Sequence, residues 1–340
     1  MHYPKACSFV CTRSCDNNCK HCTVRSPYPG SADFDIAEKV AREFKELGGW
    51  YFDATGGNPL LVPWLPDLLK INQEIRLYTS LTVSGKQIIK RTNDWGERWF
   101  LLPTLLRFSI DGDREYHDIN RGRPSNYDYT VQGIEVATKI RSRKKTQIIF
   151  TVMPGAGGNL NRNQFASVLE LARRTGVIVS VNLLFNLQYL TPEEINDLRW
   201  FAKQADIQLS KGKIRFVMRG GNNRKNPTCK AAHSVVTISP DGEMVLPCYY
   251  KQVEAISILK GLKAAYDSPE RKAVLEQDGR YDFCQGCSRW CYVIPSFLYH
   301  ILDRAIVGMH CLSGLQGIRD PILRLAGKLH LSCPHPNFHI

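Results

Sequence analysis

Two features are missing from this sequence: a long apolar run and a secretion signal. Although 43% of the residues are hydrophobic, no stretch reaches the roughly 20 uninterrupted apolar residues that a membrane-spanning helix requires. The amino terminus lacks the charged segment, apolar segment and cleavage site of a signal peptide. Internal repeats and low-complexity tracts are absent as well. These absences exclude a multi-span membrane protein and a disordered tail, and they weigh against a secreted domain built on disulfides.

The chain is basic and long enough to bury a core. Its 340 residues suffice for one large domain or two ordinary ones. Lys and Arg number 45 and Asp and Glu number 32, so the formal net charge is +13. Such a field attracts nucleic acid, anionic lipid, an acidic peptide or a phosphorylated small molecule. The net charge therefore favours a negatively charged partner but does not identify it.

Twelve cysteines are present, and their distribution is uneven. Ten of the twelve fall within residues 7–22 and 229–291, whereas residues 23–228 contain none. A chain that can build its own core does not need a disulfide framework, and close-spaced thiols in a reducing cytosol are typical of metal sites. Both groups are therefore predicted to bind a metal or an iron–sulfur cluster.

Short runs of β-branched and aromatic residues alternate with helical patterns from about residue 5 to 185. Six strands are predicted, at residues 6–11, 50–54, 76–83, 105–110, 147–153 and 177–184. Residues 34–47 and 127–142 carry apolar stripes at helical spacing. A capping box that begins at Thr191 predicts a further helix to about residue 205. This alternation is typical of a parallel sheet, which is either open and doubly wound or closed into a barrel.

The first cysteine group follows the first predicted strand directly. Cys15, Cys19 and Cys22 have the spacing C-x3-C-x2-C. Three thiolates in one loop can hold three irons of a [4Fe–4S] cube and leave the fourth iron open to a ligand. A zinc site formed with His21 or Cys11 is the alternative. The spacing resembles the defining motif of the radical S-adenosylmethionine (SAM) enzymes.

That resemblance implies both a fold and a reaction. The fold is an α/β partial (β/α)6 TIM-like barrel over residues 1–212, with the cluster loop after the first strand. The fourth iron binds SAM, and reduction of the cluster yields a 5′-deoxyadenosyl radical that abstracts hydrogen from a substrate. A one-electron donor such as flavodoxin or ferredoxin is implied as a partner. Within such a barrel, Cys7 and Cys11 are interpreted as buried thiols that line the interior.

Three further segments resemble motifs with which this family contacts SAM. The residues expected to do so are Gly56, Gly57, Asn58, Pro59, Ser109 and Arg121. Asn58 stands where the family usually has Glu, so a carboxylate contact is lost while backbone contacts to the SAM amino group can survive. Ser109 is expected near the SAM carboxylate or ribose, and Arg121 is expected to pair with the carboxylate. Asn159 and Asn182 are weaker candidates for the ribose or adenine.

The second cysteine group begins after a glycine- and asparagine-rich basic loop at residues 219–227. Two of its cysteines flank a hairpin predicted around the turn at residues 239–242, and a C-x2-C pair follows. The order resembles the SPASM extension of radical SAM enzymes, or its shorter form, twitch. The resemblance implies a small α+β domain over residues 213–295 that holds an auxiliary [4Fe–4S] cluster. The expected ligands are Cys229, Cys248, Cys284 and Cys287.

Several alternatives remain open at this point. A zinc ribbon also uses four thiolates and a hairpin. Cys291 either replaces one of the four ligands or joins Cys311 and Cys333 in a further site. For the whole chain, the competing hypotheses are a zinc-stabilised nucleic-acid-binding protein and an iron–sulfur electron carrier without SAM chemistry. Nucleic acid is not expected as a partner of the enzyme.

Residues 296–340 are predicted to form basic amphipathic helices. They pack on their own protein or contact a membrane surface. The protein is expected to be cytoplasmic. If the helices contact a membrane, we expect that contact to be peripheral and at the inner membrane surface. The substrate is predicted only by class, as an anionic small molecule, a lipid or isoprenoid, or a peptide. No general acid or base is assigned, although Tyr249, Tyr250 and Arg289 lie near the second cysteine group.

Overall fold

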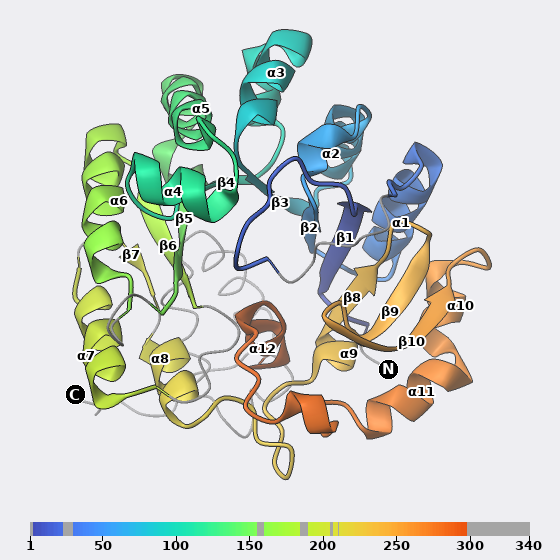
Figure 1. Cartoon of the computed structure of the whole chain (residues 1–340). Helices are drawn as coiled ribbons and strands as arrows, with labels where there is room; N and C mark the ends of the chain where they lie inside the picture. The colour runs from blue at the N-terminus through green and yellow to red at the C-terminus, as the bar shows by residue number, and fades with distance from the viewer. Residues whose placement is uncertain are drawn as a thin grey trace, which may run out of the picture.

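A ten-stranded sheet forms the centre of the molecule (Figure 1). The computed structural model describes residues 3–22, 30–154, 160–183, 190–204, 207–209 and 211–297. The strand order is β10-β9-β8-β1-β2-β3-β4-β5-β6-β7. The strands are β1 (Ala6–Thr12), β2 (Tyr51–Gly56), β3 (Tyr78–Val83), β4 (Leu105–Ser109), β5 (Thr146–Val152), β6 (Ile178–Leu183), β7 (Ile207–Gln208), β8 (Val235–Ile238), β9 (Glu243–Cys248) and β10 (Lys251–Ser257).

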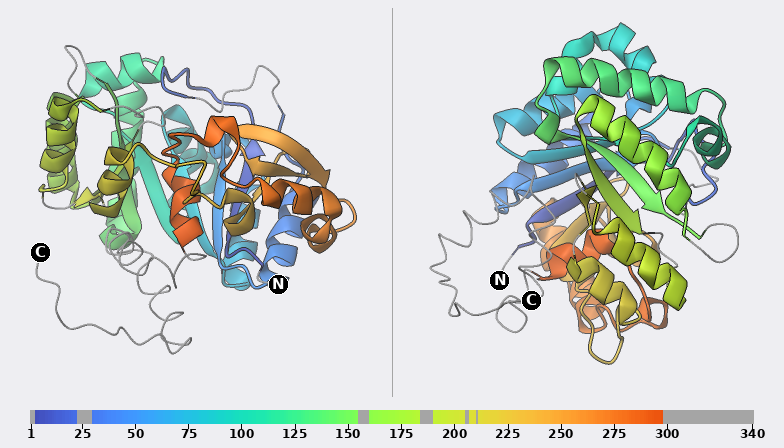
Figure 2. Two further views of the ribbon diagram at one scale, coloured as in Figure 1. Left: turned by 90° about the horizontal axis from the view of Figure 1, so that it is seen from below. Right: turned by 90° about the vertical axis from the view of Figure 1, so that its left-hand side faces the viewer.

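Helices cover the outer side of this curved sheet. The first seven are α1 (Phe34–Glu46), α2 (Leu65–Glu74), α3 (Lys86–Trp95), α4 (Arg114–Arg121), α5 (Asn126–Ile140), α6 (Arg162–Thr175) and α7 (Pro192–Phe201). The remaining ones are α8 (Lys211–Met218), α9 (Ala231–Ser234), α10 (Leu262–Asp267), α11 (Pro269–Glu276) and α12 (Trp290–Phe297). In Figure 1, α1, α2, α3, α5 and α6 follow the outside of the arc, α4 lies over the ends of the strands, and α8, α9 and α12 lie on the open side of the arc; Figure 2 gives two further views.

The predicted βα alternation is confirmed. All six predicted strands are present, and β1 to β7 pair in parallel with their neighbours. The result is a partial TIM-like barrel rather than a flat doubly wound sheet. The predicted capping box is also present: the Thr191 hydroxyl accepts from the Glu194 N–H at 3.2 Å, and the Glu194 carboxylate accepts from the Thr191 N–H at 3.0 Å.

Aromatic packing defines which face of the sheet meets the helices. The ring of Phe52 lies 5.9 Å from that of Phe9 and 6.5 Å from that of Phe44 in α1. Because side chains alternate along a strand, Cys7 shares this helix-facing side with Phe9. Cys7 and Cys11 are buried, as predicted. The prediction that Cys7 lines the barrel interior was wrong, because the phase of the alternation turns it toward the helical layer.

The sheet continues from the barrel into the region of the second cysteine group. Strand β8 pairs in parallel with β1, and the predicted hairpin is formed by β8 and β9, with Ile238 opposite Met244. The side chain of Arg13, just after β1, donates to Asp241 in the hairpin turn at 3.1 Å. The two cysteine groups are therefore attached to adjacent strands, and the division near residue 212 stays a prediction.

None of the helices described is long and apolar enough to cross a membrane. The predicted C-terminal extension falls, from residue 298 on, outside the described residues, as do Cys311 and Cys333. The hypothesis of membrane contact through this extension is therefore unchanged.

Replacing Thr191 by Ala should lower the free energy of unfolding by about 1 kcal/mol, because the Glu194 N–H at the start of α7 loses its side-chain acceptor. Urea denaturation of the anaerobic protein measures the change. Thr191→Ser keeps the hydroxyl and should match the wild type. Equal losses in both variants would contradict the assignment to the cap.

Candidate functional site

The candidate SAM-contacting segments meet at one edge of the sheet. The cysteine loop follows β1, Gly56 ends β2 and Ser109 ends β4. In parallel β/α barrels the carboxyl ends of the strands carry the active site. Phe108 packs outward against Phe100, with ring centroids 6.4 Å apart. Ser109 alternates with it and therefore faces the barrel interior at this edge.

The glycine-containing segment after β2 holds the start of the cysteine loop. The Gly57 N–H donates to the Thr12 carbonyl at 2.7 Å, and the Asn58 N–H donates to the Ser14 carbonyl at 2.8 Å. A Cβ on Gly57 would lie 2.0 Å from the Ser14 carbonyl oxygen, so only glycine allows this approach. The Asn58 side chain donates to the Asp16 carboxylate at 2.8 Å. The residue that replaces the family's Glu therefore contacts the cysteine loop itself.

Arg121 is held by a buried carboxylate. Its Nε and Nη2 donate to the two oxygens of Asp111 at 2.6 and 2.8 Å, and its Nη1 lies 3.7 Å from Cys19 Sγ. Asp111 is fully buried and Arg121 is 8% exposed. Burial raises the pKa of Asp111, but the charge of Arg121 outweighs it and holds that pKa below its ordinary value. The contact of Arg121 with the SAM carboxylate stays a prediction, and its observed partners are Asp111 and a cysteine of the loop.

The last turn of α4 lies along the cysteine loop. The backbone N–H groups of Asn18 and Lys20 donate to the carbonyls of Arg121 and Asn120 at 2.8 and 2.9 Å. Gly122 has a φ of +61°, and a Cβ there would lie 2.7 Å from the Asn18 carbonyl oxygen. The helix end and the loop thus share main-chain hydrogen bonds. In the sequence only Arg121 marks this segment, and nothing in the residue pattern indicates the backbone contacts.

A buried histidine connects the backbone of Asp111 to the loop. The Asp111 N–H donates to His117 Nδ1 at 3.0 Å, so His117 carries its proton on Nε2 and donates it to Asn126 Oδ1 at 2.8 Å. The Asn126 amide donates in turn to Asn17 Oδ1 in the cysteine loop at 2.6 Å. Burial, followed by the charge of Arg121, lowers the pKa of His117 to about 4. The ring is therefore neutral at physiological pH.

His117 should make the protein less stable as the pH falls. The unfolded chain takes up the histidine proton near pH 6.5, whereas the folded protein takes it up only near pH 4, so unfolding is favoured within that window. From pH 7 to pH 5 this difference amounts to about 2 kcal/mol.

His117→Gln keeps a donor and an acceptor without a titrating ring, and it should remove that part of the pH dependence. Urea denaturation of both proteins at pH 7 and pH 5, with equal iron content, makes the comparison. The same pH slope in both would contradict the assigned protonation state.

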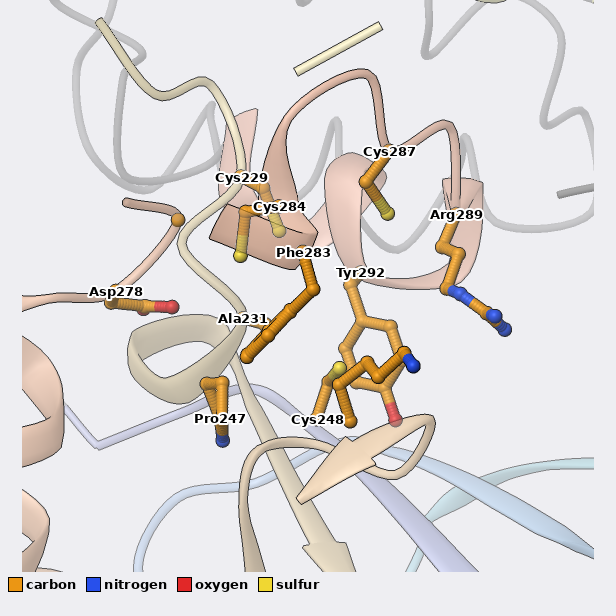
Figure 3. Close-up of a pocket in the computed structure, with 12 residues that line it drawn as sticks. Cys229, Ala231, Pro247, Cys248, Asp278, Phe283, Cys284, Cys287, Arg289 and Tyr292 are labelled. Atoms are coloured by element: carbon orange, nitrogen blue, oxygen red, sulfur yellow. The ribbon is translucent and has the colours of Figure 1, made fainter. Parts of the chain in front are cut away.

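The four predicted auxiliary ligands surround one cavity of about 160 Å³ (Figure 3). They come from separate segments: Cys229 precedes α9, Cys248 ends β9, and Cys284 and Cys287 lie before α12. The other lining residues are Ala231, Pro247, Lys251, Asp278, Gly279, Phe283, Arg289 and Tyr292. Residues far apart in the sequence thus meet as the cysteine pattern predicts.

The sulfur atoms surround a space rather than a point. Among the described residues, no three His, Cys, Asp or Glu side chains lie close enough together to hold a single metal ion. A tetrahedral zinc site would draw its thiolates to about 2.3 Å from one centre. Burial raises the pKa of Cys229, and it raises that of Cys284 to about 12. A bound metal centre is what stabilises thiolates in such surroundings.

Cys291 lies on α12 and is exposed. It is not among the described residues that line the four-cysteine cavity.

Aromatic side chains lie beside this cavity. Tyr292 lines the cavity and its hydroxyl accepts from the Tyr249 N–H at 3.1 Å. The ring of Tyr250 lies 6.1 Å from that of Tyr292, and the Arg289 guanidinium lies 3.5 Å from the Tyr250 ring centroid. Sequence position alone gave no role for these groups.

Asn182 and Asn159 are the two weaker candidates for contact with the ribose or adenine of SAM. Asn182 lies in β6, paired with Thr151 of β5. Asn159 lies outside the described residues. A contact of Asn182 with SAM stays a prediction.

Comparison with known proteins agrees with this geometry. Residues 9–159 match the model of the radical SAM superfamily. An AdoMet-dependent heme synthase of Methanosarcina barkeri is 26% identical over 230 residues, 61% of each chain. Another, of Oleidesulfovibrio alaskensis, is 29% identical over 142 residues, which are 38% of this chain and 35% of the relative. The chain thus spans less than two thirds of the curated relatives that it matches.

Solved structures share the fold at low sequence identity. Streptococcus suis SuiB bound to the precursor peptide SuiA superimposes with a TM-score of 0.63 at 15% identity, covering 85% of this chain and 70% of SuiB. The enzyme anSMEcpe with bound AdoMet and a peptide gives 0.57 at 12% identity, covering 96% and 99%. Residues 9–159 are thus similar to the radical SAM superfamily, and the named relatives agree with an iron–sulfur enzyme that uses SAM.

Proposed function

We propose that this protein cleaves SAM at a cluster held by Cys15, Cys19 and Cys22 and transfers hydrogen from a substrate in the barrel. An auxiliary [4Fe–4S] cluster is assigned to Cys229, Cys248, Cys284 and Cys287. The observation that carries the proposal is the cysteine loop at the carboxyl edge of the sheet, fixed there by the Arg121–Asp111 ion pair. That edge is where β/α barrels place their chemistry.

The donor set of the loop fits an open iron–sulfur cluster. Three thiols come from one loop, and the Arg121 Nη1 directed at Cys19 is a donor suited to a thiolate. Burial raises the pKa of Cys15 to about 11, so a metal has to displace its proton. When bound, the reduced cluster supplies the electron that cleaves the carbon–sulfur bond of SAM and yields the 5′-deoxyadenosyl radical.

The surrounding residues suit SAM as the ligand. The N–H groups of Gly57 and Asn58 already donate to the loop, so the carbonyls of the 56–58 segment are what the SAM amino group would contact. Ser109 faces the interior and is 7% exposed at the end of β4. We assign its hydroxyl to the SAM carboxylate or ribose. Pro59 starts a short 3-10 helix, which the Asn58 side chain caps at the Leu60 N–H, 3.2 Å away.

The four-cysteine cavity supports an auxiliary cluster over the zinc alternative. The four cysteines line a cavity of about 160 Å³, and within the described part of the chain they do not lie close enough together to hold a single ion. A cluster there would supply an acceptor for an electron that a substrate radical loses, because iron–sulfur potentials are set by burial and hydrogen bonding. Tyr292 lines this cavity, and the ring of Tyr250 lies 6.1 Å from that of Tyr292.

For the substrate we propose an anionic heme precursor. The curated relatives are named heme synthases, and the net charge of +13 suits a ligand that carries carboxylates. The barrel interior offers polar groups for such a ligand. Asp53 follows the outward-facing Phe52 in β2, and Arg107 precedes the outward-facing Phe108 in β4, so both polar side chains face the interior. Arg107 Nη2 donates to the Tyr51 hydroxyl at 3.3 Å. An electron donor such as flavodoxin or ferredoxin completes the proposal.

Anaerobic protein incubated with dithionite and SAM should form 5′-deoxyadenosine, measured by liquid chromatography. Cys19→Ala should abolish it, because the loop loses one of three cluster ligands. Iron-replete wild-type protein that forms none would favour the electron carrier, and a colourless zinc protein would favour the nucleic-acid-binding alternative. Circular dichroism of Cys19→Ala must match the wild type for the loss to count.

A further inference from the structure

The asparagine before the second cysteine group connects the segments that carry it. Asn222 is fully buried. Its Oδ1 accepts from the Cys229 N–H at 2.9 Å, and its Nδ2 donates to the carbonyls of Gly279 and Cys284 at 2.9 and 3.1 Å. One amide group therefore bonds to Cys229, seven residues ahead, and to two residues of the distant stretch 279–284.

The backbone of Asn222 adds two more contacts. Its N–H donates to the Cys287 carbonyl at 2.9 Å, and its carbonyl accepts from the Gly286 N–H at 2.8 Å. With these, the residue touches the main chain at or next to three of the four cavity cysteines. Only an amide side chain offers an acceptor and a two-proton donor in this space, so no other residue of similar size satisfies the same groups.

Two glycines permit this close approach. Gly221 has a φ of +73°, and a Cβ there would lie 2.5 Å from the Gly286 carbonyl oxygen. Gly279 has a φ of +79°, and its Cβ would lie 2.3 Å from the Cys229 carbonyl oxygen. The backbones on both sides of the cavity are thus in contact with the segment around Asn222 and with each other.

We infer that Asn222 is the positioning residue of the auxiliary site, which sets the separation of Cys229 from Cys284 and Cys287. The inference rests on the proposed function only in that an auxiliary cluster fills the cavity. Four cluster ligands on separate segments must be held apart while the cavity is empty, because any collapse would bring thiols together. Asn222 does this through hydrogen bonds to main-chain atoms, which do not involve the cysteine sulfurs.

The test compares three variants purified anaerobically, with iron and sulfide counted and the reduced clusters examined by EPR. Wild type should hold about eight irons, whereas Asn222→Ala should hold about four and lose the auxiliary signal. Asn222→Asp keeps the acceptor for Cys229 but turns a carboxylate oxygen toward two carbonyls, so it should lose the same cluster. Asn223→Ala is the matched control, because Asn223 is exposed and, among the described residues, its side chain accepts only from the nearby Lys225 N–H.

The remaining outcomes separate this inference from the proposed function. An Asn222→Ala protein that keeps both clusters, or loses them in equal proportion, would overturn the inference. If the wild type holds only about four irons, the proposal of an auxiliary cluster is wrong. In that case the rate at which iodoacetamide alkylates Cys229 tests the role of Asn222. Slow labelling in wild type and Asn223→Ala with fast labelling in Asn222→Ala supports it, and equal labelling overturns it.

Discussion

The buried ion pair between Asp111 and Arg121 is the interaction on which the candidate SAM site depends. Two charges removed from water are tolerated only when they are paired and hydrogen-bonded, and losing one partner leaves the other at a cost of several kcal/mol. Here the carboxylate follows β4 and the guanidinium ends α4, so the pair fixes the helix against the sheet. The cysteine loop then bonds to that helix end. A mobile loop could not keep three thiols in one arrangement.

The second constraint is the pairing of β8 with β1. It makes the hairpin of the auxiliary region an extension of the barrel sheet. The cysteine loop therefore follows a strand that is adjacent to the hairpin, and Arg13, just after β1, donates to Asp241 in the hairpin turn. The same sheet thus carries the first cysteine group and the hairpin whose second strand ends at Cys248.

Much of this arrangement was predictable from sequence, because its signals are local. Strand and helix periodicity gave all six barrel strands, Thr191 and Glu194 gave a cap, and cysteine spacing gave two groups of thiols that the fold assembles separately. What sequence could not give were contacts between distant segments. The bonds of Asn58 to Asp16 and of Asn222 to the cysteine segments form only when the folded chain brings these residues together. No spacing of residue types along the sequence predicts them. The face that Cys7 occupies depends on the phase of the strand, which residue type alone does not set.

The most direct test of the central claim is an EPR titration of the reduced anaerobic protein with SAM. An iron with no protein ligand binds SAM directly, so the account predicts that the signal of one cluster changes in shape as SAM is added while any second signal stays constant. A reduced cluster whose spectrum is the same with and without saturating SAM would contradict it.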